Sequence, residues 1–259
     1  MINSLAGCNF FSTFDLKSVY HQVPIKEADQ KYTAFEANGR RYHFRRIPFQ
    51  RAMDKFVDEE GLKVTFPHLD NITVAGRDQE EHDENVQKFH NAIHRRNVTL
   101  NKTKTVEFKS SINSLGYGIG IGVITPDPER LRPLQDLPPS DNARTLQSVV
   151  GMFAYFAKWI PNFSDKIKRL RQATTIPLDS NALAAFYTLK KELENVALHH
   201  IDESLPFVVE CEASEVGLSA TLNQAGRPVA FMTRMLHGSE LHPAVKQEAI
   251  AIVEAVLKW

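Results

Sequence analysis

Residues 65–74 have the sequence TFPHLDNITV, in which a short apolar run breaks at an Asp-Asn pair and then resumes. This pattern predicts two strands joined by a tight turn, because Asp and Asn accept the backbone conformations that turn tips require. The pair has two interpretations. Asp70 and Asn71 are turn residues alone, or they are half of a metal site at a hairpin tip.

A second carboxylate lies upstream of this hairpin. Residues 11–25, FSTFDLKSVYHQVPI, predict a strand that runs past Asp15 into a helical turn. Transfer of a nucleotidyl group uses two divalent ions, and Mg²⁺ prefers hard oxygen ligands brought together from neighbouring strands. Either carboxylate alone is unremarkable, but Asp15 and Asp70 together are candidates for such a site.

The rest of the chain predicts a mixture of helices and strands. Hairpins are expected around Asn38-Gly39 and Ala225-Gly226 and within residues 115–124, because glycine after Asn or Ala favours a tight turn. Proline-rich residues 126–139 predict a linker. The remaining expected helices are 51–62, 80–96, 146–160, 163–170, 182–198 and 245–259, and three strands are expected at 206–214, 217–224 and 227–236.

The composition is that of a soluble globular protein, with 42% hydrophobic and 24% charged residues. Since 31 basic residues balance 31 acidic ones, no net field draws the chain to nucleic acid or membrane. The basic residues nevertheless gather in three clusters, at 39–51, 94–104 and 158–172. Each cluster alone is explained by a solvated helix face, but the three together suggest a local nucleic-acid footprint.

Features of secreted and membrane proteins are missing from the sequence. Cys8 and Cys211 form no disulfide framework, the first residues lack a signal-peptide pattern, and no run of eighteen apolar residues occurs. We expect an intracellular protein, cytoplasmic or nuclear, that is not secreted and does not enter a membrane.

Nearly the whole chain resembles, in the correct order, the polymerase region of Pol polyproteins from gypsy-type LTR retrotransposons. The polymerase similarity is carried by FSTFDLKSVYHQVPI, KYTAFEANGRRYHFRRIPF, HLDN, SLGYGIG and LQSVVGMFAYFAKWIPNFSDKIKRL. The segments PFVVECEASEVGLSATL and KQEAIAIVEAVLKW are similar to the opening of the attached ribonuclease H domain.

The resemblance implies an α+β fold in three parts. Residues 1–126 would form a reverse transcriptase palm, an antiparallel sheet with helices and a remnant of the fingers. Residues 127–200 would form the thumb and connection helices. Residues 201–259 would form the N-terminal part of a ribonuclease H-like domain with a partial sheet.

The resemblance also implies roles for individual residues. Asp15 and Asp70 would be catalytic and would bind two Mg²⁺ or Mn²⁺ ions, with Asn71 as a degenerate third position. Glu212 and Glu248 would be carboxylates of the ribonuclease H site. Tyr20 would exclude a 2′-hydroxyl, and Gln50 would lie in the substrate-binding region. The residues that would contact nucleic acid are Gly116, Tyr117, Lys158, Lys166, Lys168 and Arg169.

The implied partners are an RNA or DNA primer–template duplex and deoxynucleoside triphosphates. In a full element the remaining Pol domains, protease and integrase, would be partners as well.

Several departures from the family pattern predict impaired activity. Asn71 replaces an Asp that would bring negative charge, and His68 replaces a Tyr. A glycine- and proline-containing segment that separates Phe49 from Gln50 in the family is missing. Glu212 replaces an Asp, the chain begins just before the first catalytic motif, and it ends before the later ribonuclease H carboxylates. We therefore expect weak or absent reverse transcriptase and ribonuclease H activity.

Two other functional classes stay open: a host-adopted nucleic-acid-binding protein without catalysis, and a pseudogene product. Tyr20 has the alternative of an ordinary core aromatic. His90 and His94 are not expected to bind zinc, because their HNAIH segment lacks the glutamate of a zinc protease. The glycines of residues 115–124 are not a dinucleotide motif, since prolines rather than a helix follow them. The stripe of Phe153, Phe156 and Trp159 is expected to pack helices rather than stack on bases.

Overall fold

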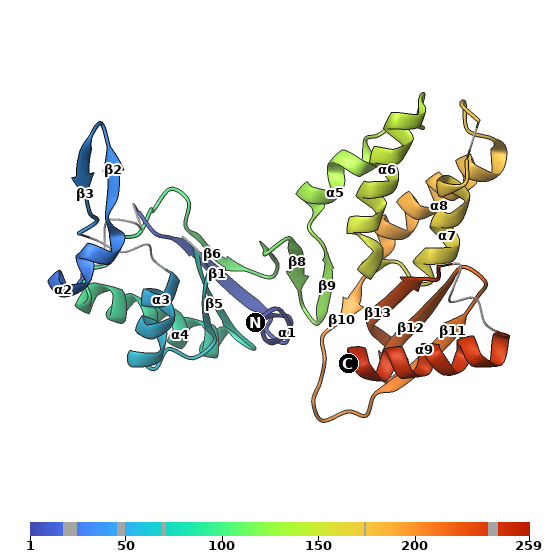
Figure 1. Cartoon of the computed structure of the whole chain (residues 1–259). Helices are drawn as coiled ribbons and strands as arrows, with labels where there is room; N and C mark the ends of the chain where they lie inside the picture. Colours follow the sequence, from blue (N-terminus) through green and yellow to red (C-terminus); the bar gives the residue numbers. More distant parts are fainter. Residues whose placement is uncertain (18–24, 46–49, 69–70, 174, 238–242) are drawn as a thin grey trace. The chain divides into compact units, whose positions relative to one another are not determined.

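The structure is a computed structural model, and it describes residues 1–17, 25–45, 50–68, 71–173, 175–237 and 243–259 (Figure 1). Contacts divide the chain into two compact units, Met1–Ile112 and Asn113–Trp259. Both combine antiparallel sheets with helices, which confirms the predicted α+β class. This division follows compactness alone, so the three-part division drawn from the sequence stays a prediction.

The first unit is built on a four-stranded sheet. Its strands are β4 (Thr65–His68), β5 (Asn71–Gly76), β1 (Phe10–Asp15) and β6 (Val106–Lys109), in that order. All neighbours are antiparallel, and β1 pairs with β5 without a break from Phe10 opposite Gly76 to Asp15 opposite Asn71. The hairpin predicted at residues 65–74 is confirmed as β4–β5.

Helices and a separate hairpin complete this unit. The hairpin β2 (Phe35–Ala37) to β3 (Arg40–Tyr42) turns at Asn38 and Gly39, both with positive φ, as predicted. Before β2, Lys31–Thr33 forms a 3-10 turn in which the Thr33 hydroxyl donates to the Gln30 carbonyl. The helices are α1 (Ile2–Ala6), α2 (Glu27–Gln30), α3 (Gln50–Glu59) and α4 (Gln79–Arg95).

Side chains of β1 and β5 alternate between two faces of the sheet. Phe14, Ile72 and Val74 lie on one face and share a core with Met53 of α3 and Phe89 of α4. Burial of such side chains contributes roughly 1.5–3 kcal/mol each, so this core fixes which face meets the helices. The opposite face carries Thr13, Asp15, Asn71 and Thr73 of the same strands, whereas Ser12 lies on the helix side.

A buried polar chain ties β1 to α4 and β6. The Ser12 hydroxyl oxygen accepts the Phe108 N–H at 3.1 Å and lies 2.9 Å from Nε2 of His82, and both side chains are almost fully buried. A hydroxyl group can accept and donate at once, so Ser12 can serve both the Phe108 N–H and the His82 ring. Nδ1 lies 3.0 Å from an Asp83 oxygen, so each of these polar groups has a partner.

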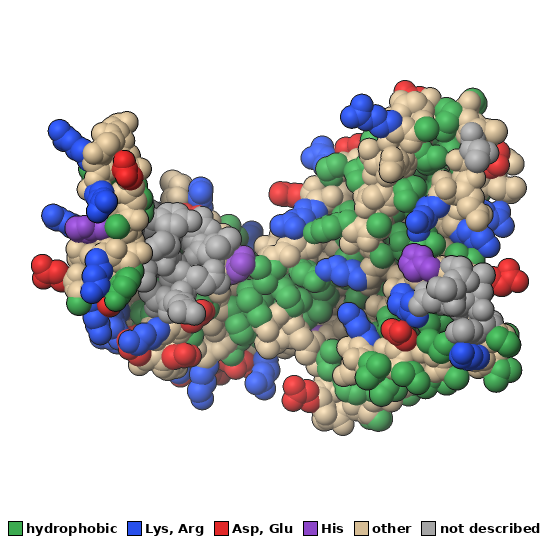
Figure 2. Space-filling view, viewed as in Figure 1, with side chains coloured by type: hydrophobic (Ala, Val, Ile, Leu, Met, Phe, Trp, Pro, Cys, Tyr) green, Lys and Arg blue, Asp and Glu red, His purple; other side chains and the backbone are tan. Residues whose placement is uncertain are grey.

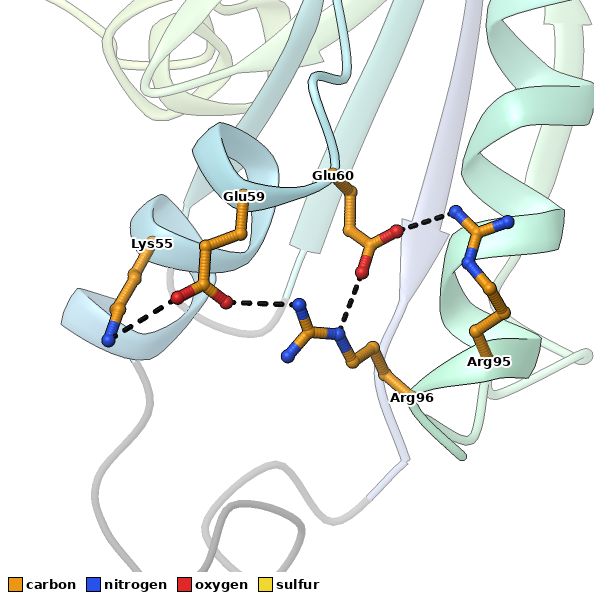
Figure 3. A network of polar contacts seen from close by, with 5 residues as sticks. All are labelled: Lys55, Glu59, Glu60, Arg95 and Arg96. Atoms are coloured by element: carbon orange, nitrogen blue, oxygen red, sulfur yellow. Dashed lines mark hydrogen bonds and ion pairs between the residues drawn. The ribbon is translucent and has the colours of Figure 1, made fainter.

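An ion-pair network joins the ends of α3 and α4 (Figure 3). Glu60 accepts from Arg95 at 2.5 Å and from Arg96 at 2.7 Å, while Glu59 lies 3.0 Å from Arg96 and 3.4 Å from Lys55. These hydrogen bonds lower the pKa of both carboxyls: Lys55 and then Arg96 act on Glu59, and Arg95 and then Arg96 act on Glu60.

This network predicts a pH dependence of stability. A carboxyl whose pKa is lowered by folding stabilises the protein above its unfolded pKa, and that contribution is lost as pH falls through the folded pKa. We expect the melting temperature of the parent chain to fall below about pH 5. Glu60→Gln should show a shallower fall, and the exposed control Glu36→Gln should follow the parent. If Glu60→Gln fell as steeply as the parent, the network would contribute nothing measurable.

The second unit contains a small sheet and a helical layer. The sheet order is β10 (Leu198–His199), β9 (Val123–Pro126), β8 (Tyr117–Gly120) and β7 (Ile112–Ser114). The helices are α5 (Pro128–Gln135), α6 (Ala143–Tyr155), the 3-10 turn η3 (Ala157–Trp159), α7 (Phe163–Arg171) and α8 (Ser180–Asn195). Their shared core includes Phe153, Phe156 and Trp159, which confirms that this stripe packs helices.

The stretch predicted as a linker contains α5, so that prediction was wrong. Asp127 caps this helix, because its carboxylate accepts the Glu129 N–H at 3.0 Å. Pro128 follows at the first helical position, where its missing N–H costs nothing. Leu131 and Leu134 then face the core of the second unit. Pro128 therefore starts a helix, and Pro133 lies within it.

A three-stranded sheet follows, with order β11 (Val208–Ala213), β12 (Gly217–Gln224) and β13 (Arg227–Met235). The predicted turn at Ala225-Gly226 is confirmed, and both residues have positive φ. One face of the sheet packs on α9 (Ala244–Lys258), through Cys211, Ala220 and Ala255. The other face meets α7, where Ser164 contacts Thr233 of β13.

The described part of the chain has no helix long and apolar enough to cross a membrane. Cys8 and Cys211 are free thiols. Burial, with a contribution from Glu81, raises the pKa of the Cys8 thiol to about 11, so this group stays protonated at neutral pH.

Candidate functional site

Asp15 lies at the end of β1, on the sheet face opposite the helices. Its side chain is only 9% exposed, and one carboxylate oxygen lies 3.6 Å from Nζ of Lys104. The Asp15 carbonyl accepts the Asn101 N–H at 2.7 Å. The segment before β6 therefore supports this end of β1 through its backbone and places a positive charge beside the carboxylate.

Other polar residues share this face. Thr13 pairs with Thr73, and Asp15 pairs with Asn71, so these four side chains lie on one side of the β1–β5 ladder. Their oxygens are hard ligands of the kind that Mg²⁺ accepts. The described part of this face offers Asp15 as its carboxylate and Asn71 as an amide.

Three predicted residues cannot be placed in this geometry. Tyr20 and Asp70 lie outside the described residues, and Gln50 begins α3 with a side chain that lies outside them too. Asp70 directly precedes Asn71 in the sequence, and Asn71 pairs with Asp15. A site made of Asp15 and Asp70 therefore stays a prediction.

Gly116 and Tyr117 lie at a tight turn between β7 and β8. Leu115 and Gly116 both have positive φ, as in the primed turns that suit hairpins. Nζ of Lys158 donates to the Tyr117 hydroxyl at 2.6 Å and lies 4.2 Å from the centre of its ring. The tyrosine ring also packs on Trp159. The structure thus brings together three of the predicted nucleic-acid residues.

The other predicted basic residues lie on α7 and differ from one another. Lys166 pairs with Glu192 of α8 at 2.8 Å, so its charge is compensated within the protein. Lys168 and Arg169 make no side-chain ion pair with a described residue. Phosphate contacts position nucleic acid without reading its sequence, and these two residues have positive charge available for such contacts.

The basic clusters themselves divide in the same way. In the cluster at 94–104, Arg95 and Arg96 are bound to Glu60, and Lys104 lies beside Asp15. In the cluster at 39–51, Arg40 and Arg41 are exposed on β3, within the hairpin that carries basic side chains, blue at the upper left of Figure 2. Intramolecular pairing therefore reduces the footprint that the sequence suggested.

The two ribonuclease H candidates, Glu212 and Glu248, lie on opposite sides of the three-stranded sheet of β11, β12 and β13. An oxygen of Glu212 accepts a hydrogen bond from Nδ2 of Asn162, just before α7. Its neighbour Cys211 faces α9, so Glu212 points to the opposite face. Glu248 is exposed on α9. Among the described contacts none joins the two carboxylates.

Two family models match this chain. Residues 1–119 match the family described as reverse transcriptase (RNA-dependent DNA polymerase). Residues 178–259 match the RNase H-like domain found in reverse transcriptase.

The chain thus matches a reverse transcriptase domain followed by an RNase H-like domain.

Curated relatives agree with this assignment. The chain is 28% identical to a retrovirus-related Pol polyprotein from transposon gypsy of Drosophila melanogaster, over 100% of this chain and 28% of the relative. It is 29% identical to the corresponding polyprotein from transposon opus of the same organism, over 96% of this chain and 28% of the relative. The chain thus spans about a quarter of the relatives' length.

Solved structures share the fold. A foamy viral protease–reverse transcriptase in complex with double-stranded DNA has a TM-score of 0.77 and 20% identity, over 97% of this chain and 47% of that one. A foamy viral protease–reverse transcriptase in complex with an RNA/DNA hybrid has a TM-score of 0.76 and 21% identity, over 98% of this chain and 38% of that one.

Sequence reasoning missed three residues that the structure places next to predicted ones. Lys104 lies beside Asp15, Asn162 holds Glu212, and the Arg130 guanidinium lies beneath Gly116. Lys104 was counted in a basic cluster, which was a usable signal. Arg130 and Asn162 carry no local signal, because their contacts arise only when distant segments pack together.

Proposed function

We propose that this chain is the reverse transcriptase region of a retrotransposon Pol protein. We further propose that its reaction is the two-metal nucleotidyl transfer of the family, and that this activity is impaired in the present copy. The observation that carries the proposal is the register of β1 and β5, which sets Asp15 opposite Asn71 at the end of the sheet. Asp70 directly precedes Asn71 in the sequence. Two carboxylates from adjacent strands are the arrangement that this chemistry needs.

The residues at this position fit divalent ions. Asp15 is nearly buried, supplies hard oxygen ligands, and already has a cation beside it in Lys104. Asp15 and Asp70 would hold the ions, and Asn71 would add an amide oxygen without charge. When bound, such ions would lower the pKa of the attacking hydroxyl and stabilise the leaving phosphate. The β1–β5 ladder would hold the Asp15 carboxylate in place, and its backbone bond to Asn101 would limit its movement.

Nucleic acid would be held by the second unit. Gly116 and Tyr117 would place the primer end, and Lys168 and Arg169 would contact the backbone of the duplex. The foamy viral proteins of the same fold were solved with double-stranded DNA and with an RNA/DNA hybrid, which supports a duplex as the ligand.

The first test is duplex binding. The chain should bind an RNA–DNA or DNA–DNA primer–template at low salt without sequence preference, because phosphate contacts dominate. Removing one phosphate contact, in Lys168→Ala or Arg169→Ala, should lower the slope of log affinity against log salt by about 0.9. Lys191→Ala removes an exposed charge from α8 and serves as the control. A titration without binding, or strong preference among unrelated sequences, would refute the proposal.

Two features support impaired copying. Phe49 is followed directly by Gln50, where the family has an additional glycine- and proline-containing segment, although residues 46–49 lie outside the described part. The alignment with the gypsy relative spans 285 residues against 259 in this chain, which is consistent with internal loss. Asn71 adds a smaller defect, because it removes one negative charge.

Primer extension should therefore be undetectable or very slow with Mg²⁺, even when the protein is folded and binds duplex. Asn71→Asp should not restore it, because the carboxylate does not replace the missing segment. Robust extension by Asn71→Asp alone would mean that the charge, not the segment, limits the reaction. Robust extension by the parent chain would refute impairment altogether.

Ribonuclease H cleavage is proposed to be absent or weak as well. Glu212 is bound to Asn162 on the α7 face, whereas Glu248 lies on the helix that covers the other face. Two-metal cleavage needs carboxylates that converge. A second reading of the whole chain, a nucleic-acid-binding protein without catalysis, is favoured by the same observations and predicts binding with neither activity.

The metal site is tested by thermal stability. Two close carboxylates repel each other without a cation, so a bound ion should stabilise the fold by mass action. Millimolar Mn²⁺ or Mg²⁺ should raise the melting temperature of the parent by roughly 2–8 °C for about 1 kcal/mol of stabilisation. Asp15→Asn and Asp70→Asn should respond less, and in metal-free buffer they should be as stable as the parent or slightly more so.

Asp58→Asn, an exposed carboxylate of α3, is the matched control and should respond as the parent does. Equal metal responses in all four proteins would mean that Asp70 is a turn residue only.

A further inference from the structure

The β7–β8 turn rests on Arg130, the third residue of α5. The Arg130 guanidinium lies so close to the turn that a Cβ added to Gly116 would meet its Nη1 at 2.9 Å and its Cζ at 3.0 Å. Gly116 also has a φ of +80°, a backbone conformation that is strained in residues with a side chain. The backbone therefore requires the glycine, and a side chain at this position would also displace the guanidinium packed against it.

The same guanidinium is held by two further groups. Its Nη1 donates to the Tyr155 hydroxyl of α6 at 3.1 Å, and its Nε lies 3.7 Å from the Asp127 carboxylate. The Asp127 backbone N–H in turn donates to the Gly116 carbonyl at 3.3 Å. Arg130 thus connects three segments: the turn, the start of α5 and the end of α6.

The planar fork of an arginine suits this geometry. It presents several N–H groups in fixed directions, whereas a lysine ammonium is a single point of charge. Tyr155 is 58% exposed, so its ring lies at the surface while its hydroxyl is held by Arg130. The next turn residue, Tyr117, is held by a different cation, Lys158.

We propose that Arg130 is a positioning residue: it fixes the Leu115–Gly116 turn relative to α6, and thereby sets how the turn meets the primer end. The effect on the primer end rests on the proposed function, because that function has the turn contact the duplex. The fixing of the turn by Arg130 does not rest on the proposed function, because it is a property of the free chain. Arg130 acts through Gly116 and Tyr155 rather than by touching a phosphate.

The structural part is tested by hydrogen exchange on the free, full chain. Arg130→Ala should speed exchange of the amides in residues 113–119, because the turn loses the group against which it packs. Arg132→Ala is the matched control: Arg132 is also on α5, is 81% exposed, and pairs only loosely with Asp136 at 3.7 Å. Unchanged exchange in Arg130→Ala, or the same increase in Arg132→Ala, would overturn the proposal.

The consequence is tested with a primer–template that carries 2-aminopurine at the primer 3′ end. Arg130→Ala should weaken affinity by about three- to tenfold and change 2-aminopurine emission at saturation. The slope of log affinity against log salt should stay that of the parent. Arg130→Lys should behave like Arg130→Ala, because the ammonium keeps the charge but cannot bridge Tyr155 and Asp127. A slope lower by about 0.9, or full rescue by lysine, would mean a direct phosphate contact instead.

A double-mutant cycle adds a steric test. Gly116→Ala should cost less affinity in the Arg130→Ala background than in the parent, because the clash with the guanidinium is gone and only the φ strain remains. Additive effects would overturn the proposed packing. If the parent itself does not bind duplex, the proposed function fails, while the exchange experiment still decides whether Arg130 fixes the turn.

Discussion

The pairing of β1 with β5 is the constraint on which the first unit depends. Because strand side chains alternate, a slip of one residue would move Asp15 into the helix-packed core and Phe14 onto the opposite face. The apolar set of Phe14, Ile72 and Val74 prevents this slip, since it must stay against α3 and α4. The hydrophobic core thus determines where the candidate catalytic carboxylate lies.

Local patterns predicted most of the fold, and long-range contacts account for what they missed. The hairpins at Asn38-Gly39, residues 65–74 and Ala225-Gly226 have turn chemistry that is visible in sequence, and so does the aromatic stripe that ends at Trp159. The helix α5 was missed because proline was taken as a breaker, although Pro128 follows a capping Asp127. For the candidate site, the sequence predicted which residues take part but not which side chains lie next to them. Neither Lys104 beside Asp15 nor Arg130 beneath Gly116 follows from spacing.

Internal pairing redistributes the charge that the sequence suggested was free for nucleic acid. Arg95, Arg96 and Lys166 form ion pairs with glutamates, and Lys158 donates a hydrogen bond to Tyr117. Arginine and lysine therefore have two uses in this chain. Some support the turn and helix ends, and others, such as Lys168 and Arg169, are left to meet phosphate. Apolar side chains on α9 add a surface of a different kind, green at the lower right of Figure 2.

The central claim, a divalent-ion site shared by Asp15 and Asp70, is tested most directly by iron-mediated cleavage of the chain. Fe²⁺ takes the place of Mg²⁺, and with ascorbate and peroxide it generates hydroxyl radicals that cut the backbone close to the ion. The account predicts cuts around residues 15 and 70, competed by Mg²⁺ and lost in Asp15→Asn. Cuts elsewhere, or a pattern unchanged in Asp15→Asn, would contradict it.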